Sequence, residues 1–181
     1  TNQPGAAPPA RPVPGVGESL ATGRQALAEG LDGLTIVKPP YGVISAINLD
    51  RGEISWSVPH GDTPDAIRNH PALKGLTIPR TGQQTSVGTL VTKGLVIAGE
   101  PSISTAGHAR GALLRAYDKR TGKDAGTVLM DAPQTGSPMT YMWKGTQYII
   151  VTISGPNTPG QYVAFALPDS APRRTQQGGA H

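Results

Sequence analysis

The sequence contains no cysteine, few aromatic residues and no long apolar run. Among its 181 residues are 5 Tyr, 2 Trp and 1 Phe. Without cysteine the chain can form no disulfide, no thiolate metal site and no thiol nucleophile. No apolar run approaches the roughly 18 residues that a membrane-spanning helix needs. Charged residues make up only 15% of the chain, which argues against a highly charged disordered protein.

Glycine and proline are abundant, with 24 and 18 residues, so turns and loops are expected to occupy much of the chain. Between them lie short apolar or alternating segments, the pattern of β-strands, and no convincing long helix. We therefore predict an all-β fold. Nine strands are expected, at about residues 42–49, 53–58, 87–92, 94–99, 112–118, 124–129, 137–143, 146–154 and 161–167.

The net charge of +4 does not come from a basic patch. The 16 Lys and Arg residues are scattered, and the pair Arg173–Arg174 near the end of the chain is one of few adjacent pairs. Nucleic-acid-binding proteins usually cluster such residues on one face or stripe. The sequence therefore predicts no nucleic-acid partner.

Two segments repeat one hairpin pattern. AINLDRGEISW begins at Ala46, and Ala116 opens the equivalent AYDKRTGKDAG. Aligning the two alanines places Asn48 on Asp118 and Gly52 on Gly122. An Asn or Asp side chain can bond the backbone N–H groups ahead of it, and glycine accepts the positive φ of a hairpin turn. A repeated hairpin predicts repeated β units.

The nine strands group as two, four and three. A propeller cut within a blade leaves such a set, so we predict a partial β-propeller belonging to a larger parent chain. Residues 1–32 have the composition of a Pro/Gly-rich linker, with a segment that could form a short helix. Residues 33–168 are assigned to the blades, and residues 169–181 to a polar, disordered tail.

Four segments in the same order resemble the C-terminal part of the pyrroloquinoline-quinone (PQQ)-dependent dehydrogenases, in the glucose-dehydrogenase-like branch. They are KPPYGVISAINLDRGEISWSVPHGDTPDAIRNHPALKGLTIPRTG, GTLVTKGLVIAGE, GALLRAYDKRTGK and PQTGSPMTYMWKGTQYIIVTISG. The resemblance implies an eight-bladed propeller whose blades are joined by tryptophan-docking motifs. Trp56 matches a docking tryptophan, whereas the second hairpin carries Gly126 at the equivalent position, which predicts a weaker contact between blades there.

The resemblance also implies chemistry. Family members bind PQQ and a calcium ion, and an aspartate takes the hydroxyl proton of the substrate while hydride passes to the quinone. The calcium ligands and that aspartate are expected upstream of this chain, so no catalytic residue or metal ligand is assigned here. The expected partners are a sugar or alcohol substrate, the remaining blades of the parent chain and a respiratory acceptor, either a quinone or a cytochrome. The expected location is the periplasm, with membrane association through residues outside this chain left open.

Five residues of the loop IPRTGQQTSVG are candidates for binding the quinone, because the resemblance places this loop against the quinone chamber. Arg80 offers a fork of donors for a carboxylate, and the others offer hydroxyl or backbone donors. Some family members carry a quinone-contacting tryptophan where this sequence has Ser86. An alternative interpretation is that Arg80 is a solvated loop residue beside a simple turn. The candidates are Arg80, Thr81, Gly82, Thr85 and Ser86.

The segment HGDTPDAIRNH holds four potential metal ligands, namely His60, Asp62, Asp65 and His70. Their spacing matches neither a helical zinc pair nor a calcium loop, so metal binding is the less favoured interpretation. We expect instead a short helical turn at residues 64–67, capped by Asp62 or Asp65. His108 is expected at an exposed hairpin tip.

Three functions remain open on the sequence. The favoured one is the C-terminal portion of a PQQ-dependent oxidoreductase that oxidises a sugar or alcohol hydroxyl, with this chain inactive by itself. The second is a PQQ-like propeller without the quinone that acts as a protein-interaction scaffold. The third is an inactive fragment.

Overall fold

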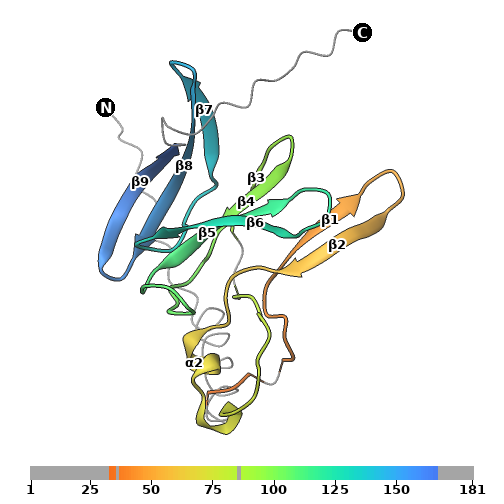
Figure 1. Cartoon of the computed structure of the whole chain (residues 1–181), viewed down its shortest axis with the longest axis vertical. Helices are drawn as coiled ribbons and strands as arrows, with labels where there is room; N and C mark the ends of the chain where they lie inside the picture. Colours follow the sequence, from red (N-terminus) through yellow and green to blue (C-terminus); the bar gives the residue numbers. More distant parts are fainter. Residues whose placement is uncertain (1–32, 36, 85–86, 167–181) are drawn as a thin grey trace, which may run out of the picture. The chain divides into compact units, whose positions relative to one another are not determined.

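The alternating segments form three antiparallel sheets in the computed structural model, which describes residues 33–35, 37–84 and 87–166 (Figure 1). The chain divides into two units, Thr1–Lys38 and Pro39–His181, and every strand among the described residues belongs to the second. The expected linker helix and the expected tail lie outside the described residues. None of the described helices is long and apolar enough to cross a membrane.

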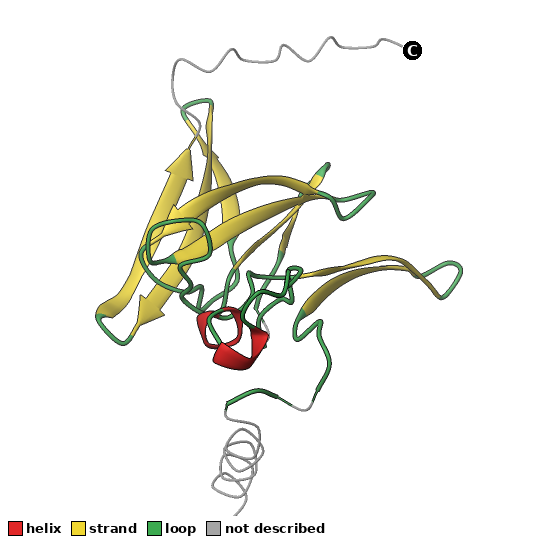
Figure 2. Cartoon of the chain, turned by 60° about the horizontal axis from the view of Figure 1, so that its bottom comes forward, coloured by secondary structure: helices red, strands yellow, loops and turns green. Residues whose placement is uncertain are grey.

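The sheets contain two, four and three strands, in the order β1-β2, β3-β4-β5-β6 and β7-β8-β9. This grouping confirms the predicted all-β fold and partial propeller. Figure 2 shows the three sheets as separate strand layers. The strands are β1 (Val43–Asn48), β2 (Glu53–Pro59), β3 (Leu90–Val91), β4 (Leu95–Gly99), β5 (Ala112–Asp118), β6 (Asp124–Met130), β7 (Met139–Trp143), β8 (Thr146–Gly155) and β9 (Thr158–Ala166).

The repeated hairpin is confirmed in detail. The side chain of Asn48 accepts backbone hydrogen bonds from Asp50 and Arg51, and Asp118 does the same for Arg120 and Thr121. The glycines that follow have positive φ angles of 67° and 71°. Both hairpins pair the matching alanine with the residue ten positions later and then shift register by one residue. Identical local sequence chemistry therefore produces the same turn and the same bulge.

Strand β3 is shorter than the predicted 87–92. Instead of continuing the ladder, the carbonyl of Gly88 accepts a hydrogen bond of 2.8 Å from the side chain of Gln134. Gly88 also lies so close to Ser137 that a Cβ at position 88 would be 2.1 Å from its Oγ. Contact with a distant segment therefore overrides the strand preference of this stretch.

The buried core lies between the second and third sheets. It combines aliphatic residues of β4, β5 and β8 with Met130 and Ala132 at the end of β6. Phe165 of β9, partly buried, packs against it. The remaining core members are Ile97, Ala112, Leu114, Val151 and Ile153.

The loop between β2 and β3 carries the helical elements α2 (Asp65–Arg68) and η1 (Pro71–Leu73). The predicted helical turn at 64–67 is thus confirmed to within one residue. The predicted capping is wrong, because the N-cap residue of α2 is Pro64 and no side chain caps it. Asp65 is held instead by Thr105 and Arg68, and Asp62 turns toward Arg115.

Candidate functional site

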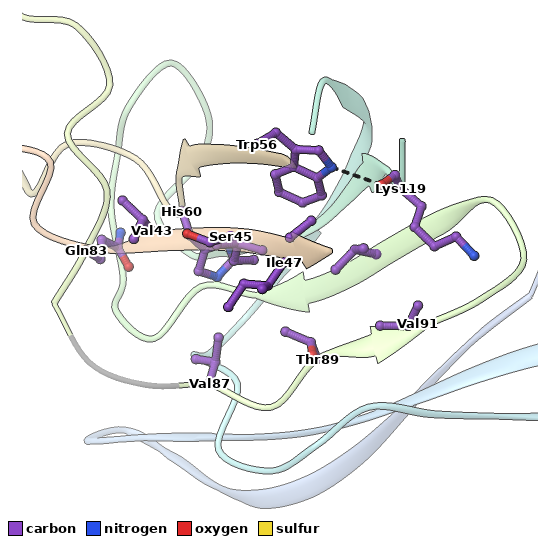
Figure 3. Close-up of a pocket in the computed structure, with 14 residues that line it drawn as sticks. Val43, Ser45, Ile47, Trp56, His60, Gln83, Val87, Thr89, Val91 and Lys119 are labelled. Carbon is purple, nitrogen blue, oxygen red and sulfur yellow. Dashed lines mark hydrogen bonds between the residues drawn. The ribbon is translucent and has the colours of Figure 1, made fainter. Parts of the chain in front are cut away.

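A cavity of about 470 Å³ lies alongside β1, between the first and second sheets (Figure 3). Half of its lining residues are aliphatic, and His60 and Gln83 lie together at one end (Figure 3). Lys119 is the one cationic side chain among the described residues that line it, since His60 is neutral as argued below. Other lining side chains are Val43, Ser45, Ile47, Trp56, Val87, Thr89, Val91 and Val96.

Backbone contacts hold the His60 end of the cavity tightly. The carbonyl of Gly42 accepts a hydrogen bond of 3.0 Å from His60, whose own carbonyl accepts one of 2.8 Å from Gln83. A Cβ at position 42 would lie only 2.0 Å from the carbonyl oxygen of Gln83, so this approach requires glycine. The segments around residues 42, 60 and 83 therefore form one rigid frame.

Gln83 is 2% exposed, and the two polar atoms of its side chain differ in their hydrogen bonding. Its Oε1 accepts a hydrogen bond of 3.0 Å from the backbone of Ser102. Its Nε2 has no hydrogen-bond partner among the described residues. A buried amide donor without a partner is costly and uncommon in folded proteins. No local pattern in the sequence marks this residue as buried, because glutamine is ordinarily a surface residue.

His60 is a buried, neutral imidazole. Burial lowers the pKa of His60, and the nearby cations Arg115 and Arg80 lower it further, against the opposing effect of the Gly99 carbonyl. Because that carbonyl can only accept, Nε2 donates to it at 3.1 Å. Nδ1 must then accept from the hydroxyl of Tyr117 at 2.8 Å. Burial raises the pKa of Tyr117 to about 12, so this hydroxyl keeps its proton.

The shifted pKa values of His60 and Tyr117 predict that the folded chain loses stability at both low and high pH. Unfolding releases His60 to its ordinary pKa of 6.5, so its contribution is complete above that pH and is lost progressively as the pH falls. The contribution of Tyr117 is complete below pH 10 and is lost as the pH rises towards about 12. Each group can change the free energy of unfolding by at most about 1.4 kcal/mol per pH unit.

Urea unfolding measured across the pH range checks this expectation. His60→Gln should remove the slope just below pH 6.5, and Tyr117→Phe the alkaline one. His70→Asn is the matched control, because asparagine can still accept the backbone hydrogen bond that His70 accepts from Ala72. An acid slope that persists unchanged in His60→Gln would show that another group causes it.

A buried ionic cluster lies next to this pair. The guanidinium of Arg115 contacts Glu100 at 2.7 Å and also contacts Asp62. Glu100 further accepts backbone hydrogen bonds from Asp62 and Leu113, and His108 Nε2 lies 3.2 Å from Asp62. Burial acts to lower the pKa of Arg115, but the two carboxylates outweigh it and hold that pKa above its usual value. Arg115 is therefore charged, and its single guanidinium is shared between the two acids.

Three members of this cluster have side chains that can bind a metal ion. One ligand atom from each of Asp62, Glu100 and His108 lies within 4.8 Å of the others. The guanidinium of Arg115 already contacts both carboxylates, so we interpret the group as an ion-pair cluster. Of the four potential ligands noted in the sequence, Asp62 is the one in this group. The expected exposure of His108 is wrong, since it is partly buried against Asp62 and Ser104.

The structure uses three of the five quinone-binding candidates in other contacts. Arg80 donates to Asp124 at 2.7 Å, so it is not an unpaired solvated arginine. Thr81 is buried, with its hydroxyl donating to the carbonyl of Gly82. Gly82 has a φ of 71° and packs against the carbonyl of Gly42. Thr85 and Ser86 lie outside the described residues. All five assignments stay predictions.

The described lining does not by itself fit a quinone with three carboxylates. Such a group needs several cations or N–H donors, whereas the described lining of the cavity beside β1 offers one cation, Lys119, and one unpartnered amide donor, that of Gln83. Arg80 is paired with Asp124 and does not line the cavity. A complete quinone site would therefore require residues outside the described part of the chain.

Comparison with known proteins defines the class. The β-propeller family described as "PQQ: Glucose/ethanol/alcohol dehydrogenase, beta-propeller domain" matches residues 4–149. The chain therefore belongs to the PQQ-dependent dehydrogenase propeller family, which confirms the resemblance seen in its motifs. The family implies PQQ as the cofactor.

Individual relatives have different substrates in their names. The chain is 32% identical over 170 residues to a "Probable quinate dehydrogenase (quinone)" of Xanthomonas campestris pv. juglandis, a match that covers 87% of this chain and 20% of the relative. It is 34% identical to a "Glycerol dehydrogenase large subunit" of Gluconobacter thailandicus, over 76% of this chain and 18% of the relative. It is 30% identical to the "Quinoprotein glucose dehydrogenase" of Escherichia coli, over 76% of this chain and 17% of the relative. The chain thus spans about a fifth of the length of these relatives.

Proposed function

We propose that this chain is the C-terminal part of the propeller of a PQQ-dependent oxidoreductase that oxidises a hydroxyl group of a sugar or another polyhydroxylated compound. The family match over residues 4–149 carries the proposal. Quinate, glycerol and glucose, the compounds in the relatives' names, all carry several hydroxyl groups. The bound quinone would supply the hydride acceptor, with electrons then passing to a respiratory acceptor.

The contribution of this chain to such an enzyme is structural. The backbone frame around residues 42, 60 and 83 fixes residues 81–83, and the ionic cluster fixes the start of the loop that follows β2. We assign the catalytic base and the calcium ligands to the rest of the parent protein. We also propose a periplasmic location, which fractionation of a tagged parent protein would test.

A scaffold without quinone is the second candidate, and one observation favours it. The described cavity is lined by only one cation, Lys119, and the arginine expected to reach the quinone is paired with Asp124. A propeller that had lost its cofactor would keep its sheets but would no longer need the cations and N–H donors that bind the quinone.

The deciding experiment uses the full-length parent protein. Calorimetry with PQQ in the presence of calcium measures binding, and dye reduction with glucose, glycerol and quinate measures turnover. We expect quinone binding and oxidation of at least one of the three substrates. A correctly folded parent that binds no quinone would contradict the proposal and favour the scaffold.

Two variants of the parent test Arg80 separately. If Arg80 contacts the quinone, Arg80→Gln should weaken quinone affinity by about tenfold or more, because a charge-assisted bond is lost. Asp124→Asn removes the same ion pair but leaves the arginine, so it should retain the affinity. Equal behaviour of the two variants would show that Arg80 serves only its pairing with Asp124. Arg51→Gln, at an exposed position, is the control.

A further inference from the structure

The two repeated hairpins differ at the residue that faces the next sheet. In the first, Trp56 pairs with Ala46, and in the second, Gly126 pairs with Ala116 at the same place before the bulge. The indole N–H of Trp56 donates to the carbonyl of Lys119 at 3.0 Å, and Figure 3 shows the ring facing that residue. A Cβ at Gly122 would lie 2.6 Å from the ring. A flat bicyclic group thus bridges the first and second sheets.

At Gly126 the same place is open. A Cβ built there would meet no atom within 4 Å. Gly126 lines a groove of about 420 Å³ between the second and third sheets. Its walls come from β4, β5 and β6 on one side and from β8 and β9 on the other. The volume lies within the range of roughly 300–1,000 Å³ that is usual for small-molecule pockets.

The chemistry of the walls defines what the groove can hold. Aliphatic side chains dominate, among them Leu114, Val128 and Ile149, and Phe165 adds an aromatic ring. Arg115 is the one charged residue among the described residues that line it, and its guanidinium is bonded to Glu100 and Asp62. A charged ligand would therefore lose its hydration without gaining a partner.

We propose that this groove binds a small, uncharged, flat aromatic compound about the size of an indole ring. The equivalent position of the other hairpin shows that a ring of this shape fits between two such sheets. Contact with the aliphatic walls would remove the apolar surface of such a ring from water, and offset contact with Phe165 would add to this. This inference does not depend on quinone binding.

Methyl NMR of the 181-residue chain, titrated with indole, tests the proposal. We expect a dissociation constant on the order of 1 mM, because the ligand has few atoms. The methyl signals of Leu114, Val128 and Ile149 should shift, while those of Val43 and Val91 in the other cavity should not. No shift in the groove, or a larger shift at Val43 and Val91, would overturn the proposal.

Substitutions at the groove provide the second test. Gly126→Trp should fill it and weaken indole binding by about tenfold or more. Gly126→Ala imposes a similar backbone demand at φ 157° without adding a ring, so it should bind indole within about twofold of the unaltered chain. If Gly126→Trp does not fold, Ala166→Phe fills the groove from β9. Unchanged binding in a folded filled variant would overturn the proposal.

Discussion

Replacing Arg115 with methionine is expected to lower the free energy of unfolding by roughly 3–5 kcal/mol, the cost of removing one partner from a buried ion pair. Arg115 is 4% exposed and Glu100 is fully buried. In the variant, Glu100 keeps its two backbone N–H donors but loses the charge that balances it. Amide hydrogen exchange in β4 and β5 would measure this effect as a free energy of local opening.

The exposed pair of Arg51 and Glu53 provides the matched control. Its atoms are 3.1 Å apart, but both side chains are more than half exposed. Arg51→Met should change stability by less than about 1 kcal/mol, since water already solvates both charges. In a double-mutant cycle, Arg115→Met with Glu100→Gln should cost less than the sum of the two single changes. Additive costs would mean that the two side chains do not stabilise each other.

Replacing Trp56 with alanine is expected to cost about 2–3 kcal/mol, somewhat below the usual cost for a fully buried tryptophan. The ring packs on Gly122 and donates to Lys119, so its removal takes away a contact between two sheets. Trp56→Phe should cost less, because it keeps much of the packing and loses the hydrogen bond of about 1 kcal/mol. Urea unfolding and hydrogen exchange in both hairpins would measure the difference.

Trp143 serves as the control for this substitution. It is 55% exposed at the end of β7 and contacts Tyr148 and Lys144 of its own hairpin. Trp143→Ala should therefore cost less than about 1 kcal/mol. Equal losses for the two tryptophans would contradict a bridging role for Trp56. The assignment of Trp56 to the family's docking motif stays a prediction that this comparison supports or weakens.

Local sequence chemistry determined the hairpins and most of the strands. Asn48 with Gly52, and Asp118 with Gly122, fix their turns within a few residues of the chain, so one sequence pattern suffices to predict them. Alternating or β-branched segments likewise place the strands to within a few residues, with β3 as the main exception. The grouping into two, four and three strands follows from the lengths of the intervening loops.

Only the tertiary structure determined which polar side chains pair with one another. Asp62 and Arg115 are 53 positions apart, and Arg80 and Asp124 are 44 apart. No local preference links such residues, because their pairing depends on how whole sheets pack. The charged Arg115 within the apolar strand ALLRAYD was the one signal in the sequence that a buried partner exists.

The same division applies to the two cavities. The sequence by itself determined that Trp56 and Gly126 occupy equivalent hairpin positions, because the turn residues fix the register. It could not show whether other side chains fill the place left at Gly126, since that depends on the packing of β5 and β6 against β8 and β9. The tertiary structure leaves that place open, and it pairs Arg80 with Asp124 because the loop after residue 79 lies against the start of β6.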